Sequence, residues 1–429
     1  MVPLDSAVNI DFPAIVARFG LPIPMIQWIV ISYVLTQTGL MLSFGRIGDM
    51  LGYRRVFLWG TGVSTLAFIG CALSPTYGAL IAARMVQGIG AGLILACGPA
   101  LATSLFPEAM RTQVLARYMM MFGIGSALGP SVFGLLVERF GWSAVFSFRA
   151  PVAAAAFVLA WSLPRPARGE RESFDAAGGV LLALALSFML LALNRLRSPG
   201  PETAVFAVLA IAGFLLFYRQ ERRVAKPIID FSLFHSADFA VINLSNALIN
   251  LSAFSIMLLA PFYLARIQGL SLPAAGLVLA ASPAGIIIAA PMAERMMRNH
   301  RPRLIALVGT ALSGAGLFAI SLSGNVPDIA VLMLSMVIQG VGIGLFQVAY
   351  FDIVTAAIPL RNRGVAGALG MATRSIGTVS GATVLMLVFQ SLQSVGADGF
   401  MPAFQATFRI AAAIPAGLIL LDLRRGRWS

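Results

Sequence analysis

The stretch Gly45-Arg46-Ile47-Gly48-Asp49-Met50-Leu51-Gly52-Tyr53-Arg54-Arg55 lies between two long apolar runs and decides the fold. Its glycines have no Cβ, so Gly45 and Gly48 let a helix end approach a neighbour closely, and Gly52 permits a tight left-handed turn. Asp49 has cations on both sides. We therefore expect it to stay ionised and to pair with a cation or cap a nearby helix N-terminus.

Composition places the chain in a lipid bilayer. Of its 429 residues, 59% are hydrophobic and only 11% are charged, whereas a soluble domain carries about a quarter charged residues. Apolar runs of about 20 residues recur along the whole length, and each is long enough to cross a bilayer as a helix. The sequence therefore predicts an all-α polytopic membrane protein with the lipid bilayer as its surroundings.

The distribution of positive charge along the chain indicates which loops lie on the cytoplasmic side of the membrane. The formal net charge is +13, but the basic residues lie in short loops and not in a compact domain with interleaved aromatics, so we expect no nucleic-acid partner. With alternating loops, one side of the membrane holds about four times the basic residues of the other, as the positive-inside rule requires of the cytoplasmic side. Cys71 and Cys97 fall in apolar runs, and His235 and His300 in basic loops, so no metal site is expected.

The apolar runs give an ordered set of spans. We predict them at 25–44, 56–74, 78–105, 113–137, 143–163, 176–194, 203–218, 239–264, 272–292, 303–322, 328–351, 364–390 and 404–422. Before them, residues 1–20 contain an apolar part too short to span. We expect either a shortened first helix or a true start that lies upstream.

The spacing Gly-x-x-x-Asp-x-x-Gly-x-Arg-Arg, which an ordinary basic loop would not need, resembles the signature loop between helices 2 and 3 of the major facilitator superfamily of secondary transporters. Six spans, a two-span insert and six further spans resemble its fourteen-helix drug:proton antiporter branch. The resemblance implies a major facilitator fold with two six-helix bundles, at 1–163 (its first helix shortened) and 237–429. A linker with two inserted helices would lie at 164–236. The run 291–303 looks like a degraded copy of the signature loop, as paired halves would give.

Two further motifs suggest how the protein would transport its substrate. Arg84 lies inside an apolar run, where an arginine is costly unless it pairs or faces a cavity, and its surroundings resemble the helix 4 motif implicated in proton coupling. The alternative is an arginine that snorkels to the membrane surface. The run that contains Gly125, Gly129, Pro130 and Gly134 packs and bends a helix, and it resembles the motif that marks exporters, although Phe133 stands where a second glycine is usual.

Asp5 and Asp11 are the candidates for proton carriage. A carboxylate in a low-dielectric cavity has its pKa raised toward neutrality, where it can load and release a proton. Asp5 matches the acidic position of helix 1 in the family, whereas Asp11 is a departure from its pattern and could equally be exposed at the outer interface. The two lie six residues apart, on roughly opposite helix faces.

Several side chains are candidates for a substrate cavity. Arg374 should lie near membrane mid-depth as a buried functional cation, and Arg149 is either a cavity residue or an interfacial anchor. The other candidates are polar or aromatic residues of apolar runs: Gln27, Trp28, Tyr33, Phe262, Tyr263, Phe346, Gln347 and Tyr350. Aromatic residues are also common in membrane proteins as core or belt residues.

The resemblance implies a proton-coupled antiporter of the plasma membrane (bacterial inner membrane). It would export small amphipathic or cationic compounds by alternating access, with a monomer as the transport unit. The loop with Gly45, Asp49, Gly52, Arg54 and Arg55 would act as its gate. The proton gradient would drive it without a cofactor, and no motif of an enzyme or of an ATP-driven pump is present. The alternatives are a sugar or organic-acid transporter of the same fold and a non-transporting membrane sensor or defective paralogue.

Overall fold

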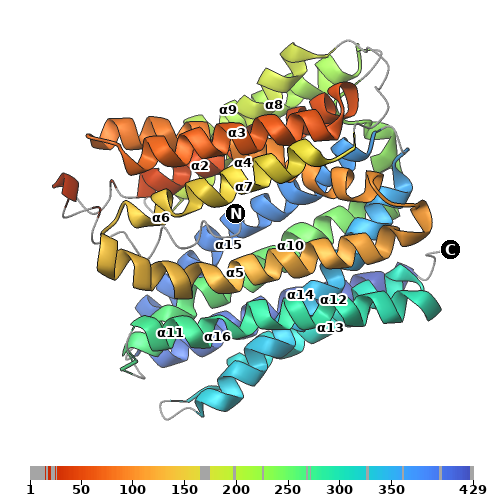
Figure 1. The fold of residues 1–429 in the computed structure, drawn as a ribbon. Helices are drawn as coiled ribbons and strands as arrows, with labels where there is room; N and C mark the ends of the chain where they lie inside the picture. The colour runs from red at the N-terminus through yellow and green to blue at the C-terminus, as the bar shows by residue number, and fades with distance from the viewer. Residues whose placement is uncertain are drawn as a thin grey trace. The chain divides into compact units, whose positions relative to one another are not determined.

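The computed structural model describes residues 15, 18–20, 25, 27–164, 174–196, 200–224, 227–266, 269–270, 272–324, 328–359, 362–395 and 399–425. Across these ranges all regular secondary structure is helical (Figure 1). The helices up to residue 221 are α2 (Gln27–Leu51), α3 (Tyr53–Ala72), α4 (Tyr77–Ser104), α5 (Arg111–Phe140), α6 (Ala144–Ser147), α7 (Arg149–Ser162), α8 (Ala176–Arg195) and α9 (Pro201–Glu221). Those that follow are α10 (Ala237–Arg266), α11 (Leu272–Leu279), α12 (Ala281–Asn299), α13 (Pro302–Ile320), α14 (Ile329–Ala357), α15 (Arg363–Val395) and α16 (Phe400–Arg425).

The predicted spans after the first all correspond to helices. Twelve stretches are long and apolar enough to cross a membrane; α6 and α7 share one of them, and the last part of α11 shares another with α12. The 30 residues of α5 are also long enough. The predicted first span, residues 1–20, lies almost wholly outside the described residues.

Local chemistry sets several helix ends. The side chain of Thr76 accepts a hydrogen bond from the Ala79 amide at the start of α4, and Asp175 does the same for Gly178 at the start of α8. Between α2 and α3 the backbone turns at Gly52 with φ of 90°, a left-handed conformation that glycine adopts without a Cβ clash. This is the tight turn that the sequence predicts.

The chain divides into two compact units. Unit 1 consists of Met1–Pro107, Val132–Phe231 and Ile358–Ala372. Within it α4 packs against both α2 and α3, α3 packs against α7, and the inserted pair α8–α9 packs on α2 through α8. An apolar core that includes Phe68, Leu80 and Phe146 lies among these helices.

Unit 2 consists of Glu108–Ser131, Ser232–Ala357 and Thr373–Ser429. Here α14 packs against α12 and α13, in the arrangement that α4 makes with α2 and α3 in unit 1, so the internal repeat is visible in the packing. The backbones of α12 and α14 approach so closely that a Cβ on Gly340 would lie 1.9 Å from the Ser282 carbonyl oxygen. Helix α16 packs on α10 and α13 and closes a second apolar core around Tyr263 and Phe404.

Two helices contribute to both units. The division falls within α5 after Ser131 and within α15 after Ala372. The division into helix bundles at 1–163 and 237–429 remains a prediction. Units 1 and 2 have other boundaries, because the first part of α5 belongs to unit 2 and the first part of α15 belongs to unit 1.

Candidate functional site

Asp49 caps the N-terminus of α15. Its Oδ1 accepts hydrogen bonds from the Gly364 amide at 2.7 Å and from the Tyr53 hydroxyl at 2.7 Å, and its Oδ2 accepts one from the Val365 amide at 3.2 Å. The first amides of a helix have no partner within the helix and carry a partial positive charge, so a carboxylate is the favoured cap. Of the two roles expected for Asp49, the structure shows the helix cap.

Small residues make this cap possible. A Cβ added to Gly45 would lie 2.6 Å from both the Gly364 carbonyl oxygen and the Ala368 Cβ, so any larger residue would push α15 away from α2. Arg46 adds a long hydrogen bond of 3.4 Å from its Nη1 to Asn362 Oδ1. The structure therefore brings the first part of the signature loop together with a segment more than 300 residues later.

The basic end of the loop is placed differently. Arg54 donates a hydrogen bond to the carbonyl oxygen of Trp161 at the end of α7, and Arg55 is exposed. Neither guanidinium takes part in the cap that Asp49 makes. Their predicted part in a gate remains a prediction.

The start of α5 in unit 2 is held by a similar set of groups. Arg111 Nε and Thr112 Oγ1 both donate to Asp352 Oδ1 on α14, at 3.0 and 2.9 Å, and Gln113 Nε2 donates to Glu294 Oε1 on α12 at 2.5 Å. Glu294 belongs to the predicted copy of the signature loop. Asp352 was missed by sequence reasoning, although a carboxylate near the end of the long apolar run of α14 is a usable signal.

Arg84 is fully buried within α4. Its Nε donates to the Ile29 carbonyl oxygen at 2.9 Å and its Nη1 donates to Gln87 Oε1 at 2.7 Å, while the guanidinium lies 4.4 Å from the centroid of the Tyr33 ring. A side chain with 0% exposure does not reach a membrane surface, so the structure argues against snorkelling. Two neutral oxygen acceptors and an aromatic face thus contribute to holding this desolvated cation.

Arg149 is also fully buried, at the start of α7, with its guanidinium 4.5 Å from the centroid of the Phe68 ring. This placement argues against the interfacial anchor.

In unit 2, neutral polar side chains form what we term the amide cluster: Asn243, Asn246 and Asn250 of α10, Gln347 and Tyr350 of α14, and Thr373 of α15. Asn246 links the three helices, because its Nδ2 donates to Thr373 Oγ1 at 2.7 Å and its Oδ1 accepts from Gln347 Nε2 at 2.9 Å. The Tyr350 hydroxyl donates to Asn243 Oδ1 at 2.8 Å. Two of the predicted cavity residues, Gln347 and Tyr350, are thus found together.

Arg374 follows the amide cluster directly along α15. Its guanidinium lies 4.2 Å from the centroid of the Phe122 ring on α5, and the Tyr118 side chain is close enough to interact with it electrostatically. The side chain is partly exposed although it lies three turns from the start of its helix. Sequence reasoning identified Arg374 but not its aromatic partner.

The remaining predicted site residues are scattered. Tyr263 lies in the apolar core of unit 2 with its hydroxyl bonded to the Gly324 carbonyl oxygen at 2.9 Å, whereas Phe262 beside it is 46% exposed. Trp28 is exposed near the start of α2, and Gln27 is the first residue of that helix. Asp5 and Asp11 lie outside the described residues. Gly125, Gly129, Pro130 and Gly134 all lie within α5, which continues through the proline as one helix.

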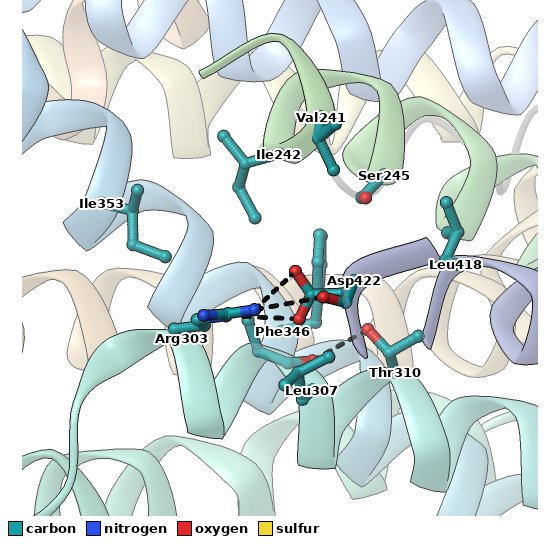
Figure 2. Close-up of a pocket in the computed structure, with 11 residues that line it drawn as sticks. Val241, Ile242, Ser245, Arg303, Leu307, Thr310, Phe346, Ile353, Leu418 and Asp422 are labelled. Carbon is teal, nitrogen blue, oxygen red and sulfur yellow. Dashed lines mark hydrogen bonds and ion pairs between the residues drawn. The ribbon is translucent and has the colours of Figure 1, made fainter. Parts of the chain in front are cut away.

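A small cavity in unit 2 contains another ion pair (Figure 2). Arg303 of α13 makes two contacts with the carboxylate of Asp422 on α16, from Nη2 to Oδ1 at 3.1 Å and from Nε to Oδ2 at 3.3 Å. The cavity measures about 30 Å³, room for one or two water molecules. The predicted cavity residue Phe346 lines this cavity, but the cavity is too small for an organic substrate. In the described part of the chain no three His, Cys, Asp or Glu side chains gather as metal ligands would.

Comparison with known families decides the class of the protein. Residues 4–234 and 242–425 match the model of the Major Facilitator Superfamily. The chain belongs to this superfamily. The fold predicted from the signature loop is confirmed, and the assignment indicates a transporter and not an enzyme.

Individual members of the superfamily are similar to this chain over most of its length. The riboflavin transporter RibZ of Clostridioides difficile is 29% identical over 396 residues, which cover 91% of this chain and 86% of RibZ. The multidrug resistance protein Stp of Mycobacterium tuberculosis is 27% identical over 391 residues, which cover 90% of this chain and 73% of Stp. The solved structure of the proton:xylose symporter XylE matches with a TM-score of 0.68 at 15% identity, covering 98% of this chain and 92% of XylE, and it shows the fold alone.

Proposed function

We propose that this major facilitator protein is a proton-coupled antiporter that exports small amphipathic or cationic compounds by alternating access. It would act in the bacterial inner membrane, as a monomeric transport unit driven by the proton gradient. The proposal assigns proton binding to Asp5 or Asp11, with Arg84 as the cation that responds to it. Substrate and proton would disfavour each other's binding, which couples the two flows.

The cap that Asp49 makes on α15 carries the proposal. A carboxylate that holds the first amides of a helix from another part of the chain is a contact that can form and break as a unit, because it consists of hydrogen bonds that water can replace. Alternating access needs such a reversible contact at one side of the membrane. We assign the closed gate to the capped state and the open gate to its release.

Export, and not uptake, is supported by two observations. The Gly129-Pro130 pair lies within the single helix α5 and resembles the exporter motif. One of the similar proteins is named for multidrug resistance. The twelve candidate spans of the described residues, together with α5 and the first span predicted at 1–20, would give the fourteen of the drug:proton antiporter branch, which we retain as part of the proposal.

A metabolite transporter is the second candidate, since another similar protein is named a riboflavin transporter. The two candidates differ in what they transport and agree on the fold and on the gate. A panel of structurally unrelated compounds separates them: a multidrug exporter moves several, and a metabolite transporter moves one.

The test is transport in proteoliposomes under an imposed proton gradient, followed with an amphipathic fluorescent dye. We expect movement that needs the protein and the gradient and that is lost with Asp5→Asn or with Asp11→Asn. The matched control is Asp328→Asn, an exposed aspartate that caps α14 through the Ala330 amide and should leave transport unchanged. Dye movement that is independent of the gradient would refute proton coupling, and full activity in both helix 1 variants would refute the assigned proton sites.

A further inference from the structure

Charge is distributed unevenly within the described helices of unit 2. The acidic residues Asp238, Glu294, Asp352 and Asp422 all lie in the first or last two turns of their helices. Arg374, in contrast, lies about 16 Å along α15 from its first residue, at 1.5 Å per residue. The deep part of this unit therefore holds a fixed positive charge and, among the described residues, no carboxylate at the same depth.

Among the described residues, the surroundings of Arg374 offer its donors no hydrogen-bond acceptor. Its guanidinium packs on the face of Phe122, and within the described residues it makes no ion pair and no side-chain hydrogen bond. A guanidinium has five N–H donors in one plane, and a ring face beside it satisfies none of them. The Arg374 side chain is partly exposed, so packed protein does not enclose it completely. A membrane-embedded arginine with this environment is built to meet a ligand.

The helix segment that carries Arg374 is also held in position. Thr373, its neighbour in sequence, is fixed by Asn246 of the amide cluster. One turn further on, Gly377 packs so closely on α10 that an added Cβ would lie 2.1 Å from the Ala247 carbonyl oxygen. These contacts fix α15 against α10, so the backbone at Arg374 does not have to be ordered when a ligand arrives.

We propose that Arg374 and Phe122 form an anion-binding subsite for the transported compound. It would take a carboxylate, or a comparable single negative charge, carried on a flat aromatic or conjugated body. The guanidinium binds the carboxylate through two parallel N–H donors, and the Phe122 ring and the Tyr118 side chain accept the flat body beside it. A cationic compound is repelled by the same fixed charge. This inference rests on the proposed export function. Within that function, it predicts that the exported compounds are acidic and not cationic.

The test uses three anthracene probes with the same flat body and different charge: 9-anthracenecarboxylate, 9-anthracenemethanol and 9-(aminomethyl)anthracene. Their equilibrium binding to the full chain in lipid nanodiscs is measured by fluorescence at pH 7, without a proton gradient, and empty nanodiscs are subtracted. We expect the carboxylate to bind at least tenfold more tightly than the alcohol, and the amine to bind no better than the alcohol.

Variants then assign the preference to one residue. Arg374→Gln should lower affinity for the carboxylate at least tenfold and leave affinity for the alcohol unchanged, while Arg374→Lys should retain a preference for the carboxylate. Phe122→Leu should weaken all three probes, because it removes the ring and not the charge. The control Arg223→Gln removes an exposed positive charge after α9 and should change nothing.

The outcomes separate this inference from the export function. Equal binding of the three wild-type probes, preference for the amine, or unchanged carboxylate binding in Arg374→Gln would overturn the subsite; the wild-type comparison decides this even if that variant fails to fold. Gradient-driven movement of a cationic dye without carboxylate binding would refute the subsite and leave the antiporter standing. Carboxylate binding that depends on Arg374, without transport of any compound, would support the subsite and refute export.

Discussion

Replacing Asp49 with asparagine should loosen the first turn of α15 by an amount that follows from its hydrogen bonds. The carboxylate accepts the Gly364 and Val365 amides through different oxygens, so a carboxamide, with one acceptor oxygen, loses one of these bonds and the charge. A hydrogen bond to a charged group contributes about 1.5–3 kcal/mol, and a charge at a helix N-terminus about 0.3–1 kcal/mol. Asparagine remains a good N-cap and recovers part of this. We expect a net loss of about 1–3 kcal/mol, which is about 5- to 150-fold in the equilibrium between capped and released states.

Hydrogen–deuterium exchange measures that loss directly. In a peptide covering residues 362–369, exchange of the first amides of α15 should rise by about 5- to 150-fold in Asp49→Asn. The control is Asp328→Asn, which should affect the peptide containing Ala330 and not the start of α15. Unchanged exchange at Gly364 and Val365 in Asp49→Asn would refute the argument that the carboxylate holds this helix, and with it the gate assigned to the loop.

Two further predictions concern stability in detergent or nanodiscs. Arg84→Lys should lower the free energy of unfolding by about 1.5–3 kcal/mol, because a single ammonium does not reproduce the two directed hydrogen bonds of the guanidinium; a melting temperature equal to that of wild type would contradict this. Gly340→Ala should cost about 1–3 kcal/mol through overpacking against Ser282. Gly417→Ala, where an added Cβ meets nothing within 4 Å, serves as its control, and equal melting temperatures for the two variants would contradict the close approach of α12 and α14.

The helices were predictable from the sequence, and their partners were not. Hydropathy placed the spans within a few residues, because a membrane helix needs about 20 apolar residues whatever it packs on. The same rule identified Arg84 and Arg374 as functional candidates, since arginine is costly in apolar runs. The sequence near residue 364, however, contains nothing that marks it as the helix end that Asp49 caps. The acceptor of Arg84 on α2 is a main-chain carbonyl, which no side-chain pattern reveals.

The asparagines of the amide cluster were within reach of sequence reasoning and were missed. Asn243, Asn246 and Asn250 recur at a spacing that places them on one face of α10, inside a long apolar run. A stripe of amides in lipid is as informative as a single arginine, because each amide needs a hydrogen-bond partner there. The sequence analysis selected Arg374, Gln347 and Tyr350 but not the asparagines of α10 that bind to the latter two residues and to Thr373.

The cap on α15 also has a consequence for how the protein is made. Asp49 and the amide that it binds are 315 positions apart, so the carboxylate is synthesised and inserted long before the helix end that needs it. Until the two meet, the first turn of α15 has only water or lipid headgroups for its amides. This contact therefore forms only after nearly the whole chain has been inserted in the correct order. In molecules that were inserted incorrectly, the first turn of α15 stays uncapped and frayed, and a quality-control protease that cleaves frayed helix ends would degrade those molecules.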